Sequence, residues 1–362
     1  MSITQQSKKV AILSQYPGDI SPGQRFRYQQ YLSFLAKQGI ICHEYPFLDM
    51  STTSILYKKG HTLHKILGVL WGFIRRTMLL FRLVRYDCVF IYREASPIGP
   101  PFFEWFIAKI LGKKIILDFD DAIWMNKTVS QNPLVAWLRN HQKVAKICKW
   151  AWKVTCSNAF LANFAQQLNQ QVIQIPTTID TENYHFPVKQ HRQKEHTIIG
   201  WTGTITTMIY LDALFPILEK VAEKYPIKFL IISNQAPKIA RPFIEFQQWK
   251  AATEIADLRQ FDIGIMPLSN TEWEKGKGGF KALQYMALGI PPVVSPVGVN
   301  KDIVQDNLNG FHATTPEEWI DKLSRLIESV DLRKKIGASG RKTVVEHYSV
   351  LSQQDRYLAL FT

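Results

Sequence analysis

A short glycine-rich loop with two lysines lies just before an expected helix. The loop reads Lys275-Gly-Lys-Gly-Gly279, and the expected helix spans Phe280–Leu288. Backbone N–H groups and the positive end of the helix dipole attract a phosphate at such a junction. Glycine allows close approach of a ligand, and Lys277 and Lys281 add positive charge. The pattern indicates a diphosphate cradle, although a helix-capping turn beside solvated lysines would read the same way.

A cluster of carboxylates ends an expected strand in the other half of the chain. Asp118-Phe-Asp-Asp121 follows the apolar run Lys113–Leu117. Carboxylates this close should raise at least one pKa, which suits proton transfer. The Asp-x-Asp spacing also suits a divalent cation, and aspartates before a helix can act as caps. The spacing leaves all three roles open.

Two arginines follow the first Gly/Pro-rich loop, Pro17–Gly23. Arg25 and Arg27 open a stretch that we expect to be helical as far as Lys37. Guanidinium groups bind phosphate well, so a phosphate on a ligand is their expected partner. On a first helical turn they would otherwise be ordinary surface arginines.

Short apolar runs alternate with helical stretches along the chain, which predicts parallel sheets covered by helices on both faces. In the first half, strands are expected at Lys8–Ser14, Ile40–Pro46, Tyr86–Arg93, Lys113–Asp118, Val154–Ser157 and Val172–Ile175, with a helix at Pro101–Leu111. In the second half, strands are expected at Thr197–Trp201, Phe229–Ile232, Phe261–Met266 and Pro292–Ser295, with helices at Leu211–Lys224, Phe280–Leu288 and Glu317–Val330.

The alternation predicts an α/β protein of two doubly wound, Rossmann-like domains that face a central cleft. The first domain would span 1–180 and the second 197–345, because the polar, proline-containing segment 181–196 between them has the composition of a linker. The tail 346–362 would pack back on the first domain. Ligands of such sheets bind at the carboxyl ends of the strands, where both charged motifs lie.

Several spaced motifs resemble one family of enzymes. Gly276–Pro291 reads G-K-x-G-F-K-x-x-Q-Y-M-A-x-G-x-P, and Ile199–Gly203, Phe246–Trp249, Ser295–Asn300, Asn309–Phe311, Arg25–Arg27, Tyr92–Glu94 and Asp118–Trp124 fit the same order. Together they resemble glycosyltransferase family 4, the retaining GT-B glycosyltransferases of group 1 type, in a bacterial subgroup with this motif.

The resemblance implies a glycosyltransferase that moves a sugar, such as a hexose, from a nucleotide diphosphate sugar to an acceptor, with retention and with no cofactor or obligatory metal. Residues 197–345 would bind the nucleotide-sugar donor, and 1–180 the acceptor. The implied donor-binding residues are Gly203, Trp249, Glu254, Glu274, Gly278, Gly279, Gln284 and Gly298. The implied acceptor-side residues are Arg25, Arg27, Arg93, Asp118 and Asp121. Asp120, where the wider family often has His, and the phosphate-binding Lys277 and Lys281 would be catalytic.

The chain departs from the family in its glutamate pair. The usual E-x7-E would fall on Gly276 and Gln284, so both glutamates are missing. Gln284 can still hydrogen-bond a ribose hydroxyl, and Glu274, two residues early, could replace the first glutamate. The basic residue usual after the first strand of this domain is also missing from Thr202–Thr207. Lysines of the glycine-rich loop and helix would then supply that charge.

Charge and hydrophobicity are concentrated in one acid-free segment. The chain has 44 Lys and Arg against 30 Asp and Glu, and Ser51–Tyr86 contains no acid but seven basic residues. At helical spacing most basic residues share one side, and the other side carries Leu63, Ile66, Leu67, Leu70, Ile74, Met78 and Phe81. This is typical of an interfacial membrane helix, and also of a helix packed on its domain with a solvated cationic face. An anionic membrane is the expected partner; nucleic acid is not, because no nucleic-acid motif occurs.

The remaining patterns favour a cytoplasmic enzyme, peripheral on the inner face of the cell membrane, in lipid-linked glycan or surface polysaccharide synthesis. The four cysteines are scattered without zinc spacing, and neither a signal peptide nor a transmembrane helix is expected. Two alternatives stay open. One is a nucleotide-sugar epimerase or phosphorylase on the same fold. The other is a catalytically weak sugar-nucleotide or membrane-binding module, which the missing glutamates would favour.

Overall fold

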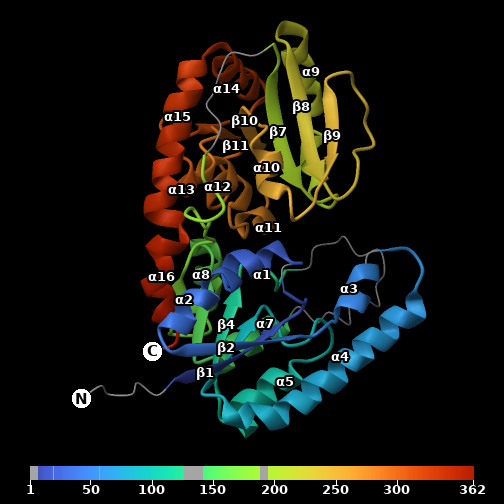
Figure 1. Cartoon of the computed structure of the whole chain (residues 1–362), viewed down its shortest axis with the longest axis vertical. Coiled ribbons are helices and arrows are strands. Elements are labelled where there is room, and N and C mark those ends of the chain that lie inside the picture. The colour runs from blue at the N-terminus through green and yellow to red at the C-terminus, as the bar shows by residue number, and fades with distance from the viewer. Residues whose placement is uncertain (1–6, 19, 57, 126–141, 188–194) are drawn as a thin grey trace. The chain divides into compact units, whose positions relative to one another are not determined.

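The computed structural model describes residues 7–18, 20–56, 58–125, 142–187 and 195–362 (Figure 1). The chain divides into two compact units. Unit 1 comprises Met1–Thr177 and Gln354–Thr362, and unit 2 comprises Thr178–Gln353. Part of the predicted linker, 188–194, lies outside the described residues.

Unit 1 contains a parallel six-stranded sheet in the order β2-β1-β3-β4-β5-β6. Its strands are β1 (Lys8–Ser14), β2 (Ile40–Pro46), β3 (Cys88–Tyr92), β4 (Lys114–Phe119), β5 (Lys153–Cys156) and β6 (Val172–Gln174). The central strands are continuous apolar runs because helices cover both faces, and β3 is buried throughout. The strand order reverses between β1 and β3, so the loops after β1, β3 and β4 lie at the usual ligand-binding edge.

The helices of unit 1 include one long surface helix, α4 (Thr62–Arg82). The others are α1 (Pro22–Arg27), η1 (Gln29–Tyr31), α2 (Leu32–Lys37), α3 (Met50–Ile55), η2 (Leu83–Arg85), α5 (Phe102–Trp105), the π-helical turn η3 (Phe106–Ile110), α7 (Lys143–Trp150) and α8 (Ala159–Gln166). The prediction of a single helix from Arg25 to Lys37 was wrong, because this stretch forms α1, η1 and α2. It is broken at Tyr28 (φ −130°), whose buried hydroxyl donates to Glu44 on β2 at 2.9 Å.

The end of the chain, Gln354–Thr362, belongs to unit 1 and includes the second half of the last helix, α16 (Val350–Leu358). The Tyr357 ring stacks on that of Tyr31, with ring centroids 4.0 Å apart. The Lys153 ammonium donates to the carbonyl of Ala359 at 2.8 Å, which satisfies a helix C-terminal acceptor. These contacts tie the C-terminal segment to the sheet of unit 1.

Unit 2 contains a second parallel sheet, in the order β12-β11-β10-β7-β8-β9. Its strands are β7 (Thr197–Gly203), β8 (Ile227–Ser233), β9 (Ile244–Gln248), β10 (Ile263–Met266), β11 (Pro292–Val294) and β12 (Phe311–His312). The order reverses between β7 and β10, as in a Rossmann fold. Both sheets are parallel and covered by helices on both faces, so the α/β, doubly wound prediction is confirmed (Figure 1).

The helices of unit 2 cover its sheet and close a large apolar core around β7, β8 and β10. They are η4 (Met208–Leu211), α9 (Phe215–Lys224), α10 (Glu254–Leu258), α11 (Glu272–Lys275), α12 (Phe280–Ala287), α13 (Asn300–Ile303), α14 (Pro316–Glu328), α15 (Val330–Thr343) and η5 (Val344–Tyr348). The sharpest start is that of α14, where Thr315 and Glu318 form a capping box. In the described residues, no helix is both long enough and apolar enough to cross a membrane.

Candidate functional site

The glycine-rich loop of unit 2 lies at the edge where its sheet reverses. β10 is followed by α11, the loop Gly276–Gly279 and then α12, which runs back along the sheet. The start of α12 therefore lies at the carboxyl edge beside the ends of β7 and β10. Doubly wound sheets bind their ligands at this edge.

Gly279 begins α12 in a conformation that only glycine adopts easily. Its φ is +68°, and a Cβ there would lie 2.2 Å from Cδ1 of Ile303. No side chain caps α12 at this position. The helix start thus presents backbone rather than a capping side chain, as a phosphate site requires.

Gly279→Ala is expected to lower the stability of unit 2 by about 2–4 kcal/mol, from left-handed strain plus the clash with Ile303. Gly39→Ala is the matched control, because Gly39 also has a positive φ (+78°) but open space around its missing Cβ. That variant should lose only about 1 kcal/mol. Thermal unfolding followed by circular dichroism measures both, and equal losses would show that the contact with Ile303 does not matter.

The two predicted phosphate-binding lysines lie against aromatic rings near the start of α12. The Lys277 ammonium lies 5.1 Å from the centroid of the Trp273 ring, and that of Lys281 lies 5.8 Å from the buried Trp201 ring. Both lysines and Gly278 are half-buried. Cation–π contacts restrict the two ammonium groups, so positive charge is concentrated at the glycine-rich loop.

Two other predicted glycines serve the packing of the chain itself. A Cβ on Gly203, at the end of β7, would lie 2.5 Å from the Trp201 ring and 2.7 Å from Oγ1 of Thr207. Gly298 has φ +54°, and a Cβ there would lie 2.8 Å from the carbonyl oxygen of Lys275. These glycines let Trp201 and α11 pack closely beside the site.

Gln284 meets a carboxylate that comes from another helix. Glu254, in the first turn of α10, accepts from the amide of Gln284 and from the indole N–H of Trp249, each at 3.4 Å. Both Gln284 and Glu254 are buried. The three residues were predicted on the donor side, but their mutual contact was not, because sequence spacing does not bring α10 to α12. A carboxylate therefore lies beside the position where the family has its second glutamate.

Gln284→Glu, which restores the family residue, is expected to destabilise unit 2 by about 1–3 kcal/mol, because two buried carboxylates would then meet. The deficit should shrink as the pH falls and one carboxyl becomes protonated. The exchange Gln284→Glu with Glu254→Gln restores a donor and an acceptor, so it should recover most of the loss. The unfolding midpoints of the single and the double variant test this prediction. A double variant as unstable as the single one would refute the pairing of Gln284 with Glu254.

Glu274 is buried in α11, and its carboxylate accepts hydrogen bonds from the hydroxyls of Tyr210 and Thr271. Tyr210 lies in η4, after β7, so Glu274 links that segment to the loop after β10. The glutamate predicted to replace the missing first glutamate is thus part of the framework of the site. Tyr210, to which the sequence analysis assigned no role, holds it there.

On unit 1, Arg27 and Asp118 form a buried ion pair. Both side chains are 1% exposed, and the guanidinium meets both carboxylate oxygens, at 2.5 and 3.1 Å. Arg27 also donates to the carbonyl of Ile175 at 2.5 Å. Burial alone would lower the pKa of Arg27, but the contact with Asp118 keeps that pKa above its ordinary value. The two residues predicted on the acceptor side thus engage each other, and their pair joins α1 to β4.

Arg93 holds the two remaining aspartates. Its guanidinium lies 2.7 Å from Asp120 and 2.8 Å from Asp121, and the Tyr92 hydroxyl donates to Asp120 at 2.9 Å. Burial opposes the charge of Arg93, yet the two carboxylates hold its pKa well above the usual range. Asp120 and Asp121 remain partly exposed. Arg93 thus offsets the repulsion between the neighbouring carboxylates that the sequence indicated. It holds Asp120 and Asp121 together at the carboxyl edge of the sheet.

The start of α1 packs against this cluster. A Cβ on Gly23 would lie 2.1 Å from the Tyr92 hydroxyl and 3.1 Å from Oδ2 of Asp120. Arg25, half-buried, lies over the ring of Phe26, 4.5 Å from its centroid. Gly23 was not predicted as a site residue, although its Gly/Pro-rich loop was. The loop after β1 and the end of β4 are thus joined at one edge of the sheet.

The other roles considered for the aspartates find no support in the described residues. Residues 122–125 form a turn, so that segment offers no helix to cap, and 126–141 lie outside the described residues. No group of three His, Cys, Asp or Glu side chains in the described ranges is arranged to hold a metal ion.

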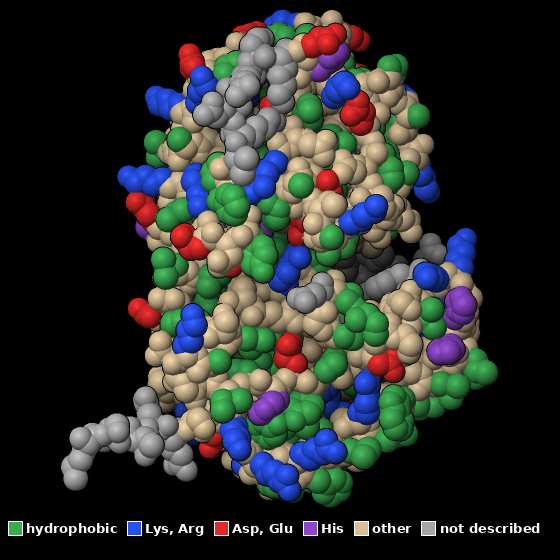
Figure 2. All heavy atoms as spheres, in the orientation of Figure 1, with side chains coloured by type: hydrophobic (Ala, Val, Ile, Leu, Met, Phe, Trp, Pro, Cys, Tyr) green, Lys and Arg blue, Asp and Glu red, His purple; other side chains and the backbone are tan. Residues whose placement is uncertain are grey.

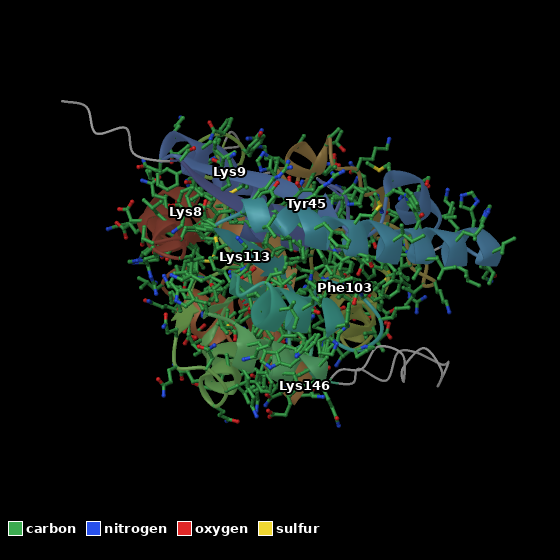
Figure 3. The ribbon with its side chains drawn as sticks, turned by 90° about the horizontal axis from the view of Figure 1, so that it is seen from below. Lys8, Lys9, Tyr45, Phe103, Lys113 and Lys146 are labelled. Atoms are coloured by element: carbon green, nitrogen blue, oxygen red, sulfur yellow. The ribbon has the colours of Figure 1, made fainter. Side chains whose placement is uncertain are left out.

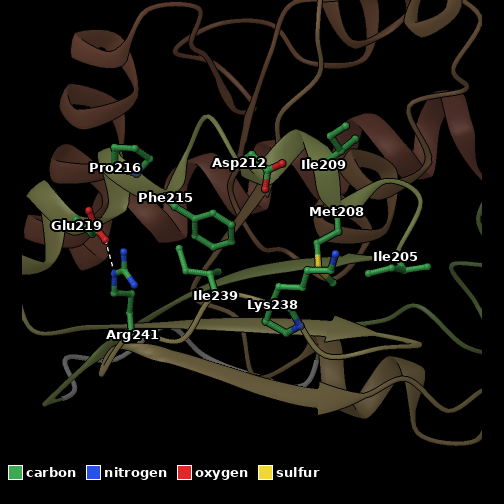
Figure 4. A pocket seen from close by; sticks show the side chains of 11 residues that line it. Ile205, Met208, Ile209, Asp212, Phe215, Pro216, Glu219, Lys238, Ile239 and Arg241 are labelled. Atoms are coloured by element: carbon green, nitrogen blue, oxygen red, sulfur yellow. Dashed lines mark hydrogen bonds and ion pairs between the residues drawn. The ribbon is translucent and has the colours of Figure 1, made fainter. Parts of the chain in front are cut away.

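A pocket of about 520 Å³ lies elsewhere on unit 2, between α9 and the segment before β9 (Figure 4). Its walls include Met208, Asp212, Phe215 and Lys238. At one end Arg241 pairs with Glu219 at 2.5 Å. None of the predicted donor-binding residues is among the described residues that line this pocket. The pocket is therefore separate from the glycine-rich loop.

Comparison with known proteins finds one matching family. Residues 196–329 match the family described as Glycosyl transferases group 1, which covers less than half of the chain. No curated protein matches the chain in sequence. The matched segment contains all six strands of the unit 2 sheet and most of its core, so unit 2 is the part of the chain that is similar to this family.

Solved structures extend the similarity to the whole chain. Sucrose-phosphate synthase from Thermosynechococcus elongatus has a TM-score of 0.71 at 12% identity, with 98% of each chain covered. Anabaena HepE in complex with UDP-glucose has a TM-score of 0.66 at 13% identity, with 97% of this chain and 98% of that one covered. A variant of TarM from S. aureus, with fondaparinux, α-GlcNAc-glycerol and UDP, has a TM-score of 0.61 at 17% identity over 80% of this chain and 59% of that one.

These likenesses show the fold, which is GT-B. Together with the similarity of unit 2 to Glycosyl transferases group 1, they support a GT-B glycosyltransferase. The predicted fold is confirmed, and the predicted enzyme class is supported at this coarser level.

Proposed function

We propose that the protein is a retaining glycosyltransferase that takes a sugar from a nucleotide diphosphate sugar. The observation that carries the proposal is the start of α12, which has two lysines, a glycine loop and no side-chain cap at the reversal of the unit 2 sheet. That HepE was solved with UDP-glucose and TarM with UDP supports a nucleotide-sugar donor. The glycoside in the TarM complex, α-GlcNAc-glycerol, supports a glycan acceptor.

The donor half of the reaction needs a stabilised leaving group. As the bond between the sugar C1 and the diphosphate oxygen breaks, negative charge grows on the diphosphate. Lys277, Lys281 and the amides at the start of α12 would stabilise this charge by preorganised electrostatics. Gly278 and Gly279 would let the phosphates approach the backbone. We propose that no metal or other cofactor takes part.

The acceptor half is proposed to lie at the carboxyl edge of unit 1. The acceptor oxygen forms the new bond to C1 as the bond from C1 to the diphosphate breaks, and the acceptor proton passes to the departing diphosphate oxygen. Asp120 would orient the acceptor hydroxyl or stabilise positive charge at C1, and Arg93 and Tyr92 would hold its carboxylate in place. Arg25 and Asp121 would contribute acceptor contacts. The product would be a lipid-linked glycan or a surface polysaccharide, made at the cytoplasmic side of a membrane.

One observation favours a second candidate, a catalytically weak sugar-nucleotide-binding module. The family glutamates are replaced by Gly276 and Gln284, and Glu274 is engaged by Tyr210 and Thr271. Such a module would bind the nucleotide but would not transfer sugar. An epimerase or phosphorylase would instead act on the donor without a glycan acceptor.

The test is release of nucleoside diphosphate from UDP-, GDP- and ADP-sugars, with and without a lipid-linked glycan extract as acceptor. The proposal expects release from one donor that depends on acceptor, and a product whose NMR spectrum shows the anomeric configuration of the donor. Release without acceptor, or an inverted product, would contradict it. Binding without turnover would favour the module.

A further inference from the structure

The apolar side of α4 points away from the body of unit 1. The seven residues that helical spacing places together, from Leu63 to Phe81, and Trp71 are all between 49% and 78% exposed. We call these eight side chains the α4 face. In Figure 2 hydrophobic side chains line the molecule along α4, with lysine and arginine beside them. The helix spans about 30 Å, so this is a continuous apolar strip and not a scattered set.

The opposite side of the helix packs on unit 1 through small residues and one arginine. A Cβ on Gly68 would lie 2.2 Å from Thr52, and one on Gly72 would lie 2.6 Å from the ring of Phe47. The buried guanidinium of Arg76 donates to the carbonyls of Ala95, Tyr45 and Ser14 at 2.7–2.9 Å. These contacts fix which side faces inward. The orientation that leaves the α4 face outside is therefore built into the sequence.

A second segment extends the same surface. α5 lies beside α4 on the underside of unit 1, where Phe103 of α5 is labelled (Figure 3). The ring of Phe103 contacts that of Phe73 in α4, with ring centroids 6.1 Å apart. Phe102, Trp105 and Ile110, in α5 and η3, are exposed. Sequence periodicity gave no sign of this addition, because it comes from a segment that begins 20 residues after α4 ends.

Most charges in and beside these segments are positive. Lys58, Lys59, Arg82, Arg85 and Lys109 are exposed, and Lys113 donates to the carbonyls of Val84 and Tyr86 at 2.9 and 2.7 Å. From Ser51 to Tyr86 there is no acidic residue. In α5 and η3 the acid is Glu104, which is buried and accepts from the amide of Ala95. An apolar strip with a cationic border matches the apolar interior and anionic headgroups of a membrane surface.

We infer that the α4 face, with Phe102, Trp105 and Ile110, inserts into the interface of a membrane that contains anionic lipid. A second copy of the chain is a poorer occupant, because a twofold contact would bring the same cationic borders together. The inference deepens the proposed function, on which its biological meaning rests, by making the acceptor a lipid-borne one. Membrane binding itself can be measured without transfer.

The test is cosedimentation of the whole protein with vesicles of phosphatidylcholine alone and of phosphatidylcholine with phosphatidylglycerol. We expect binding to the anionic vesicles that weakens with salt but persists in part, because the apolar contact is not screened. The double variant Leu70→Glu, Ile74→Glu should lower this binding at least about tenfold. Both positions are exposed and glutamate is a good helix former, so the fold should be retained.

The matched control is Leu308→Glu, Leu351→Glu, which adds the same charge at exposed leucines of unit 2. It should bind vesicles like the parent. Equal loss in both double variants, or no vesicle binding by the parent, would overturn the inference. So would a parent dimer in sedimentation equilibrium that the Leu70→Glu, Ile74→Glu variant dissociates. Vesicle binding with no nucleotide-dependent activity would sink only the proposed transfer reaction.

Discussion

Lys281→Ala is expected to lower the rate of donor turnover about 10²–10³-fold, the usual effect of removing one preorganised group from a developing negative charge. Lys281 is the half-buried lysine whose ammonium lies 5.8 Å from the centroid of the Trp201 ring, in the first turn of α12. Losing it leaves the diphosphate with less positive charge as the bond to the sugar breaks. Steady-state release of nucleoside diphosphate measures the effect.

Lys275→Ala is the matched control for this variant. Lys275 precedes the same loop and carries the same charge, but its ammonium pairs with Glu272 in α11. Turnover of the control should stay within about threefold of the parent, since removing a surface ion pair changes little. Equal activity of parent and Lys281→Ala would rule out our assignment of the phosphate site.

Asp120→Asn is expected to lower turnover about 10²–10³-fold while leaving nucleotide affinity unchanged. The substitution removes the charge that would orient the acceptor or stabilise C1, but it keeps the shape of the side chain. Because Asp120 belongs to unit 1 and the nucleotide is assigned to unit 2, the loss should appear in kcat. Parallel calorimetric titrations with UDP separate binding from turnover.

Asp121→Asn distinguishes chemistry from framework. Asp121 shares Arg93 with Asp120, and it is the more exposed of the two aspartates. Its loss should lower turnover less than about tenfold. If both variants lost activity equally and both melted at lower temperature, the cluster would be structural and Asp120 would have no catalytic role.

The strands were the most predictable part of the fold. Buried parallel strands such as β1 and β3 are continuous runs of apolar residues, so their positions were predicted within two residues. β9 was missed because it is an edge strand whose side chains are all at least partly exposed. The break at Tyr28 was missed because it depends on Glu44, which belongs to β2.

The glycine-rich loop could be predicted from the sequence, but the partners of the buried polar side chains could not. The glycine-rich loop is local, so its position before α12 followed from residues that are neighbours in the chain. The partners of Asp118 and Gln284 come from α1 and α10, far away in sequence. Spacing therefore showed that charged groups lie at the strand ends, but not that Arg27 neutralises Asp118.

The orientation of α4 illustrates the same limit. Helical periodicity shows that the apolar and basic residues occupy different sides, but it does not say which side faces the domain. Thr52 and Phe47, from segments before α4, require Gly68 and Gly72 to face inward. The alternative of an ordinary packed helix with a solvated cationic face was wrong, because the apolar side is the exposed one.

The most direct measurement of the central claim is the melting temperature of the purified protein with UDP, GDP, ADP, their sugar conjugates and inorganic phosphate. A nucleoside diphosphate at 100 times its dissociation constant should stabilise the folded state by about 2.7 kcal/mol. Our account predicts that one nucleotide raises the melting temperature and that Lys281→Ala reduces this shift, whereas Lys275→Ala does not. A well-folded protein whose melting temperature no nucleotide raises would contradict it.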